Sequence, residues 1–215
     1  MRYYYTADLH FGHKKIIEHC HRPFSSTDDM DNALISNINK RCKKDDVLFI
    51  LGDVAWYGNE SATSLLKRIK SKKILVKGNH DASLLKSREF RNCFVDIVTQ
   101  EMIHDGNKKI FLSHYPMAEW DGYYKGIWHF YGHIHNSQNA ASALMEYVPT
   151  AVNVGVDVQD FVPKTADELI SERIENYQLP DPSNLLQRTV YLAPEERQNT
   201  RTLDLGSFKN IKKIN

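Results

Sequence analysis

Histidine, aspartate and asparagine side chains gather in five short motifs along this 215-residue chain. In chain order the motifs are Asp8-Leu9-His10, Gly52-Asp53, Gly78-Asn79-His80-Asp81, Ser113-His114 and Gly132-His133-Ile134-His135. Imidazole and carboxylate ligands without a thiolate suit Mn, Fe, Zn, Co or Ni better than Ca or Mg. The set is too large for one ion, whereas two ions about 3.5–4 Å apart, bridged by a carboxylate, account for it. The motifs therefore predict a site for two divalent transition-metal ions.

Each motif follows a short run of β-branched, aromatic or other apolar residues that predicts a strand. The expected strands are 3–6, 47–51, 74–77, 93–98, 110–112, 128–131 and 152–156. Strand ends of an open α/β sheet meet at a crevice where ligands bind. In extended chain, residues two positions apart point to the same side, so we expect Asp8 with His10, and His133 with His135, each to present two ligands to one place. The glycines at positions 52, 78 and 132 would permit close backbone approach or positive φ.

The segments between these runs carry helix and turn signals. Apolar residues recur every four positions over 30–42, which marks one face of a helix. Asp105-Gly106 between two apolar runs indicates a hairpin, and Thr165 with Glu168 forms a capping box at the start of a helix. The expected helices are 30–42, 65–69, 82–86 and 165–177. The alternation of strands and helices predicts an α/β fold.

Composition excludes several classes of protein. The chain has 28 Lys and Arg against 27 Asp and Glu, a formal charge of +1. A dedicated duplex-DNA binder would show a strong basic excess, but this balance does not exclude nucleotides or short nucleic acids. No apolar run approaches the ~18 residues of a membrane span, so we expect no membrane partner. Cys20, Cys42 and Cys93 lack the spacing of a disulfide scaffold or a thiolate zinc site, which favours free thiols in a cytoplasmic protein.

The five motifs resemble those of the calcineurin-like metallophosphoesterase superfamily, whose members carry D-x-H, G-D, G-N-H-[DE], H and G-H-x-H in this order. The resemblance spans residues 3–175 and implies a four-layer α/β/β/α sandwich of two mixed sheets flanked by helices. It also implies two metal sites that share Asp53, with manganese as the first expectation. One site would be formed by Asp8, His10, Asp53 and His135, and the other by Asp53, Asn79, His114 and His133.

Domain organisation and subgroup follow from the same resemblance. We expect a metallophosphoesterase domain over 1–177, and an extension over 178–215, rich in proline and basic at its end, that is packed on the core or partly loose. Four further segments resemble small bacterial and phage members: Phe11-Gly12-His13, Arg22-Pro23-Phe24, Trp120-Asp121-Gly122 and Asn153-Val154-Gly155-Val156-Asp157-Val158. Protein serine/threonine phosphatases instead continue G-D-x-x-D-R-G, and that Asp and Arg are missing after Asp53, which disfavours that subgroup.

The resemblance assigns His80 as the acid that protonates the leaving alkoxide. Asp81 would then orient His80 or cap the following helix. His13, Arg22 and Trp120 are candidate substrate residues, because a guanidinium can fork onto phosphate and an indole can stack on a base. The alternatives are that Arg22 is simply exposed and that Trp120 belongs to the core.

Three functions fit this set of residues. The first is a metal-dependent phosphodiesterase acting on a nucleotide or short nucleic acid, the second is a phosphomonoesterase such as a nucleotidase, and the third is a non-catalytic metal-binding scaffold. A monoester carries nearly two negative charges at pH 7 and usually requires basic side chains. Since the segments 54–57 and 82–85 contain no Arg or Lys, the sequence favours the diester. The intact ligand set and His80 argue against a scaffold.

Overall fold

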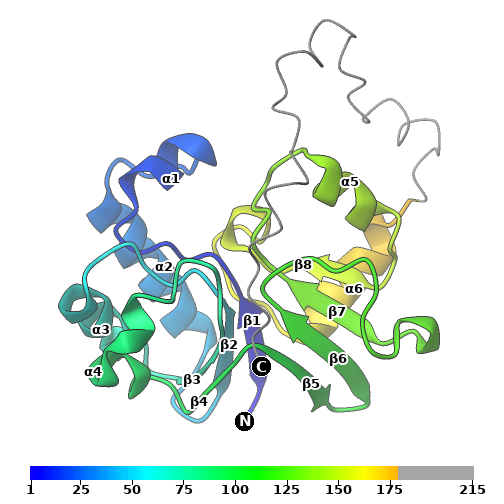
Figure 1. Cartoon of the computed structure of the whole chain (residues 1–215), viewed down its shortest axis with the longest axis horizontal. Helices are drawn as coiled ribbons and strands as arrows, with labels where there is room; N and C mark the ends of the chain where they lie inside the picture. Colours follow the sequence, from blue (N-terminus) through cyan, green and yellow to red (C-terminus); the bar gives the residue numbers. More distant parts are fainter. Residues whose placement is uncertain (179–215) are drawn as a thin grey trace, which may run out of the picture.

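The computed structural model describes residues 1–178, and its first sheet is built from four parallel strands (Figure 1). In sheet order these are β1 (Tyr3–Thr6), β2 (Val47–Leu51), β3 (Lys72–Val76) and β4 (Asp96–Val98). Every residue of β2 is buried, as expected for a central parallel strand that is covered on both faces. The parallel arrangement brings the carboxyl ends of these strands to one edge.

The second sheet mixes antiparallel and parallel pairs. In sheet order its strands are β5 (Gln100–Asp105), β6 (Lys108–Ser113), β7 (Trp128–Tyr131) and β8 (Ala151–Asn153). β5 and β6 form the hairpin that Asp105-Gly106 predicted, with Ile103 opposite Ile110, and β7 and β8 continue in parallel from β6. The two sheets meet where Ala7, just after β1, pairs with Gly155, just after β8.

Helices cover the outer faces of both sheets (Figure 1). The helices are α1 (Lys14–His19), α2 (Thr27–Arg41), α3 (Asn59–Arg68), α4 (Arg88–Arg91), α5 (Ala140–Glu146) and α6 (Ala166–Asn176), with 3-10 turns at η1 (Leu84–Lys86), η2 (Tyr123–Lys125) and η3 (Val156–Val158). Thr165 and Glu168 form the predicted capping box of α6. None of the helices within residues 1–178 is long and apolar enough to cross a bilayer.

Three hydrophobic clusters correspond to the three interfaces between these layers. Alternating side chains of β2 divide between two of them: Leu48 and Ile50 pack under α1 to α4, whereas Phe49 and Leu51 pack between the sheets. The third cluster joins Tyr131 of β7 to Met145 of α5. The helix–sheet–sheet–helix sandwich that the resemblance implied is therefore confirmed, with the mixed strand pairing confined to the second sheet.

Most helices and strands predicted from the sequence are present in the structure, but many of them begin or end at other residues than predicted. β1, β2 and β7 have the predicted bounds, and the expected helix over 82–86 is only the 3-10 turn η1. Helices α1, α4 and α5 were not predicted. The three cysteines are free, as expected. The proposed extension lies, apart from Gln178, outside the described residues.

Candidate metal centre

The five motifs lie at the carboxyl ends of β1, β2, β3, β6 and β7, as the sequence predicted. Backbone hydrogen bonds join the loops that follow these strands: the Asp8 N–H donates to the Gly52 carbonyl at 3.1 Å, and the His10 N–H donates to the Asp53 carbonyl at 3.0 Å. The Gly132 N–H donates to the His114 carbonyl at 2.9 Å. The His133 N–H donates to Oδ2 of Asp8 at 2.8 Å, which joins the motifs of the two sheets at the edge where the sheets meet.

Two glycines of these motifs, Gly52 and Gly132, leave no room for a side chain. Gly52 has a φ of +84°, and a Cβ there would lie 2.4 Å from Nδ1 of His114. A Cβ at Gly132 would lie 2.6 Å from Oδ2 of Asp8. Because both contacts are shorter than any van der Waals distance, a larger residue at either position would displace a candidate ligand.

Five of the candidate ligands have left-handed backbone conformations: φ is 59° at Asp8, 50° at His10, 55° at Asp53, 71° at His133 and 49° at His135. Asp and His tolerate this region better than most residues, and such positions cluster at functional sites. Asp8 and His10 present their side chains to one place, as expected, although their backbone is left-handed rather than extended. The expectation was wrong for His133 and His135, which belong to different groups of ligands.

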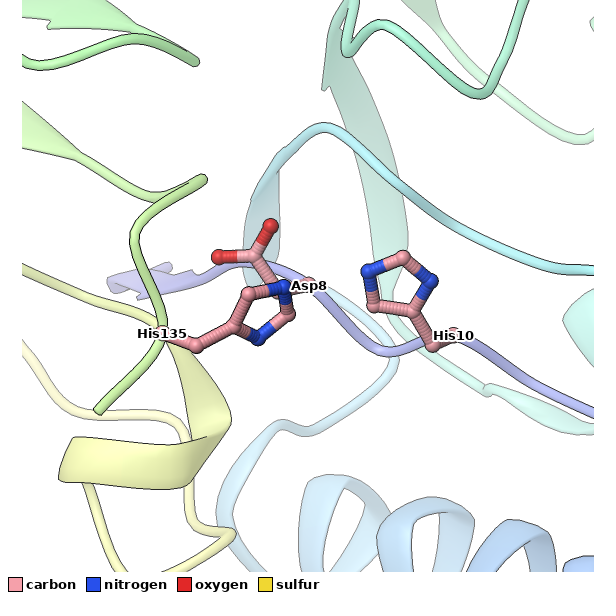
Figure 2. Close-up of side chains that lie close together, drawn as sticks. All are labelled: Asp8, His10 and His135. Carbon is pink, nitrogen blue, oxygen red and sulfur yellow. The ribbon is translucent and has the colours of Figure 1, made fainter. Parts of the chain in front are cut away.

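The first group of ligands consists of Asp8, His10 and His135, whose ligand atoms all lie within 4.8 Å of one another. Figure 2 shows the rings of His10 and His135 beside the Asp8 carboxylate. Oδ2 of Asp8 accepts the His133 N–H at 2.8 Å. Oδ1 of Asp8 and Nε2 of His10 are buried and have no hydrogen-bond partner among the described residues. Buried polar atoms without partners are costly, and a cation between them would satisfy both.

The second group consists of Asp53, His114 and His133, again with ligand atoms within 4.8 Å of one another. Nδ1 of His114 lies 2.8 Å from the Leu51 carbonyl, to which it can only donate, so Nε2 of the neutral ring carries a lone pair. Oδ1 of Asn79 lies 2.8 Å from that Nε2. With the Asn79 amide in this orientation two lone pairs face each other, and a cation bound by both would remove their repulsion.

Asp53 lies between the two groups. Its Oδ2 is 3.6 Å from Nε2 of His10 in the first group and 3.6 Å from Nε2 of His114 in the second. Its Oδ1 accepts the His80 N–H at 2.9 Å, which fixes the carboxylate. The arrangement of donors fits two cations that share one carboxylate.

Burial and hydrogen bonding shift the pKa values of these side chains in different directions. Burial lowers the pKa of His10 to about 2, with His135 adding to the effect. Burial raises the pKa of Asp8 to about 6, opposed by His135. Burial alone would lower the pKa of His135, but its hydrogen bonds to Asp157 and Cys20, together with the charges of Asp8 and Asp157, raise the pKa to about 10. Since a metal ligand must be deprotonated, His10 is ready to coordinate and His135 must first release a proton.

A buried ion pair fixes the orientation of His135. Nδ1 of His135 lies 2.7 Å from Oδ2 of Asp157, and Arg22 donates to both oxygens of Asp157, from Nε at 2.7 Å and from Nη2 at 2.9 Å. Arg22 also donates to the carbonyls of Leu9 and Asp8. Its side chain is fully buried. Arg22 is therefore neither an exposed residue nor a phosphate ligand, and it acts on the site through Asp157, a residue whose role the sequence did not indicate.

Asp81 joins two of the loops. Its carboxylate accepts the N–H groups of Gly78 at 2.8 Å, Asp53 at 3.1 Å and Val54 at 2.9 Å. Burial raises its pKa, and these N–H groups oppose that shift. The expectation that Asp81 orients His80 or caps a helix was wrong. Asp81 is fully buried, and its carboxylate holds the Asp53 loop in place.

The rim of the centre is formed by His80 and by aromatic rings. The His80 side chain is 40% exposed, with Nε2 3.9 Å from Oδ2 of Asp53. Trp56, 52% exposed, stacks on His13 with a centroid distance of 4.2 Å and meets the His80 ring edge-on at 4.8 Å. On the other side the exposed Tyr115 ring lies 4.4 Å from that of His133.

Of the candidate substrate residues, only His13 lies at this rim. Trp120 is 7% exposed, donates from Nε1 to the Ile127 carbonyl and packs in the third hydrophobic cluster. The role of Trp120 as a stacking platform was therefore wrong, and its core alternative is correct. Trp56 and Tyr115 were missed, although Trp56 is three residues after Asp53 and Tyr115 directly follows His114.

Comparison with known proteins identifies the family. The family model for calcineurin-like phosphoesterases matches residues 1–137, which include the five motifs. The chain belongs to the calcineurin-like phosphoesterase family. Membership in this divalent-metal-dependent family supports metal-dependent hydrolysis of phosphoesters, and the His and Asp groups described above could bind such ions.

Proteins similar to this calcineurin-like phosphoesterase come from Methanocaldococcus jannaschii, a Mycobacterium phage and Aquifex aeolicus. Uncharacterized protein MJ1445 of Methanocaldococcus jannaschii is 28% identical over 169 residues, covering 78% of this chain and 88% of the relative. The Gene 66 protein of Mycobacterium phage D29 is 27% identical over 186 residues, covering 74% of this chain and 90% of the relative. The structure of AQ665, a protein of unknown function from Aquifex aeolicus, matches with a TM-score of 0.64 at 25% identity, covering 79% of this chain and 98% of that one. These similarities support the fold.

Proposed function

We propose that this protein is a two-metal phosphodiesterase whose substrate is a nucleotide or a short nucleic acid. The observation that carries the proposal is the position of Oδ2 of Asp53, 3.6 Å from the free nitrogen of one histidine in each ligand group. A carboxylate shared in this way is the usual bridge of two-metal hydrolytic sites.

The assignment of ligands follows the two groups. Asp8, His10, Asp53 and His135 would bind one ion, and Asp53, Asn79, His114 and His133 would bind the other, with manganese as the first candidate among Mn, Fe, Zn, Co and Ni. When bound, such a pair makes hydroxide available near neutral pH and offsets the charge of phosphoryl oxygens.

His80 is the candidate general acid. It is the most exposed of the histidines around Asp53, and its backbone N–H is anchored by the Asp53 carboxylate, so the ring projects from a fixed point at the rim. A general acid must reach the leaving oxygen directly or through one water, and this position allows such reach. Asp81 and Arg22 act indirectly, by positioning the Asp53 loop and His135.

The preference for a diester rests on the charge at the site. A monoester presents nearly two negative charges. Arg22, the basic residue considered as a phosphate ligand, is buried beneath the candidate metal ligands with its N–H groups engaged. No Lys or Arg lines the hollow beside His80. A diester carries one charge and asks less of basic residues.

The test is the ratio of kcat/KM for bis-nitrophenyl phosphate to that for nitrophenyl phosphate at saturating Mn²⁺. We expect the diester to be preferred. A preference for the monoester of tenfold or more, about 1.4 kcal/mol of transition-state discrimination, would instead support a nucleotidase-like monoesterase.

A further inference from the structure

A hollow of about 340 Å³ opens beside the metal centre, and we refer to it as the His80 hollow. It is lined by Ala55, Trp56, Tyr57, Asn79, His80, Ala82 and Ser83. Its volume is at the small end of the roughly 300–1,000 Å³ range of ligand pockets, which suits one compact group rather than a long chain.

We propose that the His80 hollow binds the leaving-group arm of the substrate, and that this arm is an uncharged group with a planar ring, such as a nucleoside. The proposal rests on the phosphodiesterase function proposed above and adds which arm of the diester is selected, and by which residues.

The position of His80 indicates that the arm in the hollow is the leaving one. His80 and Asn79 are the two lining residues that also belong to the metal centre: Asn79 contacts His114, and His80 lies 3.9 Å from Oδ2 of Asp53. The hollow therefore begins at the centre and extends past the general acid. Because the acid must lie next to the oxygen that it protonates, the arm attached to that oxygen enters the hollow.

Trp56 indicates a planar group. His13 stacks on one face of its indole at 4.2 Å with an interplanar angle of 9°, and His80 meets the ring at 61°. These contacts fix the indole while half of the side chain remains exposed. An exposed, fixed indole is a stacking surface that accepts any base, since every base has a π-face.

The lining also indicates an uncharged group. It contains no Lys, Arg, Asp or Glu, and its polar side-chain groups are an amide, two hydroxyls, an indole N–H and the imidazole of His80. An arm carrying a further phosphate would meet no Lys or Arg among these residues. A nucleoside matches both the stacking surface and these hydrogen-bonding groups.

Binding of adenosine and of ribose to the metal-free protein, measured by calorimetry, tests the inference without any hydrolysis. We expect adenosine to bind more tightly than ribose, and Trp56→Ala to weaken adenosine binding by about 5-fold to 100-fold.

Three further variants serve as comparisons. Trp56→Phe keeps a stacking face and should keep most of the affinity for adenosine. Ala82→Leu, which adds bulk to the hollow and keeps both rings of the Trp56–His13 stack, should also weaken binding. Tyr124→Ala removes an aromatic ring that is 86% exposed outside the hollow and should leave binding unchanged. Equal binding of adenosine and ribose, or undiminished binding by both Trp56→Ala and Ala82→Leu, would overturn the proposal.

Products from the methyl ester of adenosine 5′-phosphate then identify the leaving arm in the Mn²⁺-loaded enzyme. Water adds to phosphorus, the bond from phosphorus to O5′ breaks, and O5′ takes a proton from His80, which gives adenosine and methyl phosphate. We expect these products. Adenosine monophosphate and methanol would refute the leaving-arm assignment. If neither bond is hydrolysed while adenosine binding depends on Trp56, the phosphodiesterase function fails and the nucleoside subsite stands.

Discussion

Replacing Arg22 with methionine should destabilise the fold rather than weaken substrate binding. The guanidinium is fully buried and donates to both carboxylate oxygens of Asp157 and to the carbonyls of Leu9 and Asp8. Removing one partner of a buried ion pair costs about 3–5 kcal/mol, and in Arg22→Met the Asp157 carboxylate would keep its contact with His135 but lose both hydrogen bonds from the guanidinium. For a chain of this length, about 2–4 °C of Tm is lost per kcal/mol, so Tm should fall by roughly 6–20 °C.

Thermal and urea unfolding of the metal-free variant measure this loss, with Lys14→Met as the control because it removes an exposed cation from α1 near the site. The double variant Arg22→Met/Asp157→Leu should recover part of the stability, since no buried carboxylate is left without its guanidinium partner. If Arg22→Met unfolds like the parent protein and instead raises KM for a diester, Arg22 is a phosphate ligand and the interpretation above is wrong.

Three further outcomes follow from the same contacts. Asp157→Asn should weaken metal binding by about 10-fold to 100-fold, because His135 loses the carboxylate that orients it. Competition with a chelating dye would measure this affinity, and an unchanged affinity would contradict the orienting role of Asp157. His80→Ala should reduce hydrolysis of alkyl and nucleoside esters far more than that of nitrophenyl esters, which leave without a proton; equal losses would mean that His80 positions the substrate. Because the pKa of His135 is raised to about 10, metal binding near pH 8 should release a proton from His135, and the affinity for metal should rise as pH increases toward 10. Calorimetry in buffers of different ionisation enthalpy would count the released proton. Binding without proton release would contradict the raised pKa.

The strands could be predicted from the sequence because their apolar runs end abruptly at ligand motifs. β2 is buried on both faces, so its five residues form an uninterrupted apolar segment that stops at Gly52. Helices α1 and α5 were missed because they are short and were not marked by a long apolar repeat. Pairing of the strands into two sheets came from the family resemblance, since alternation along the chain does not say which strands are neighbours.

Placement of the site residues depended on tertiary contacts that spacing does not contain. Arg22 and Asp157 are 135 residues apart, and tertiary contacts such as the pairing of Ala7 with Gly155 bring their segments together. His133 and His135 are separated by a single residue and were expected to point the same way. Their left-handed backbone conformations direct them to different groups of ligands instead. Trp56 and Trp120 are the same residue type in two loops, and burial alone distinguishes the rim residue from the core residue.

Metal content of purified Asp53→Asn, measured beside its activity, tests the account most directly. Oδ2 of Asp53 lies 3.6 Å from Nε2 of one histidine in each ligand group, and a neutral amide at this position cannot offset two cations. The parent protein and Asp121→Asn, which changes an exposed carboxylate outside the centre, should each contain two transition-metal ions per chain and hydrolyse diesters. Asp53→Asn should retain at most one ion and lose hydrolysis. Two bound ions with unchanged turnover in Asp53→Asn would contradict the shared-carboxylate centre.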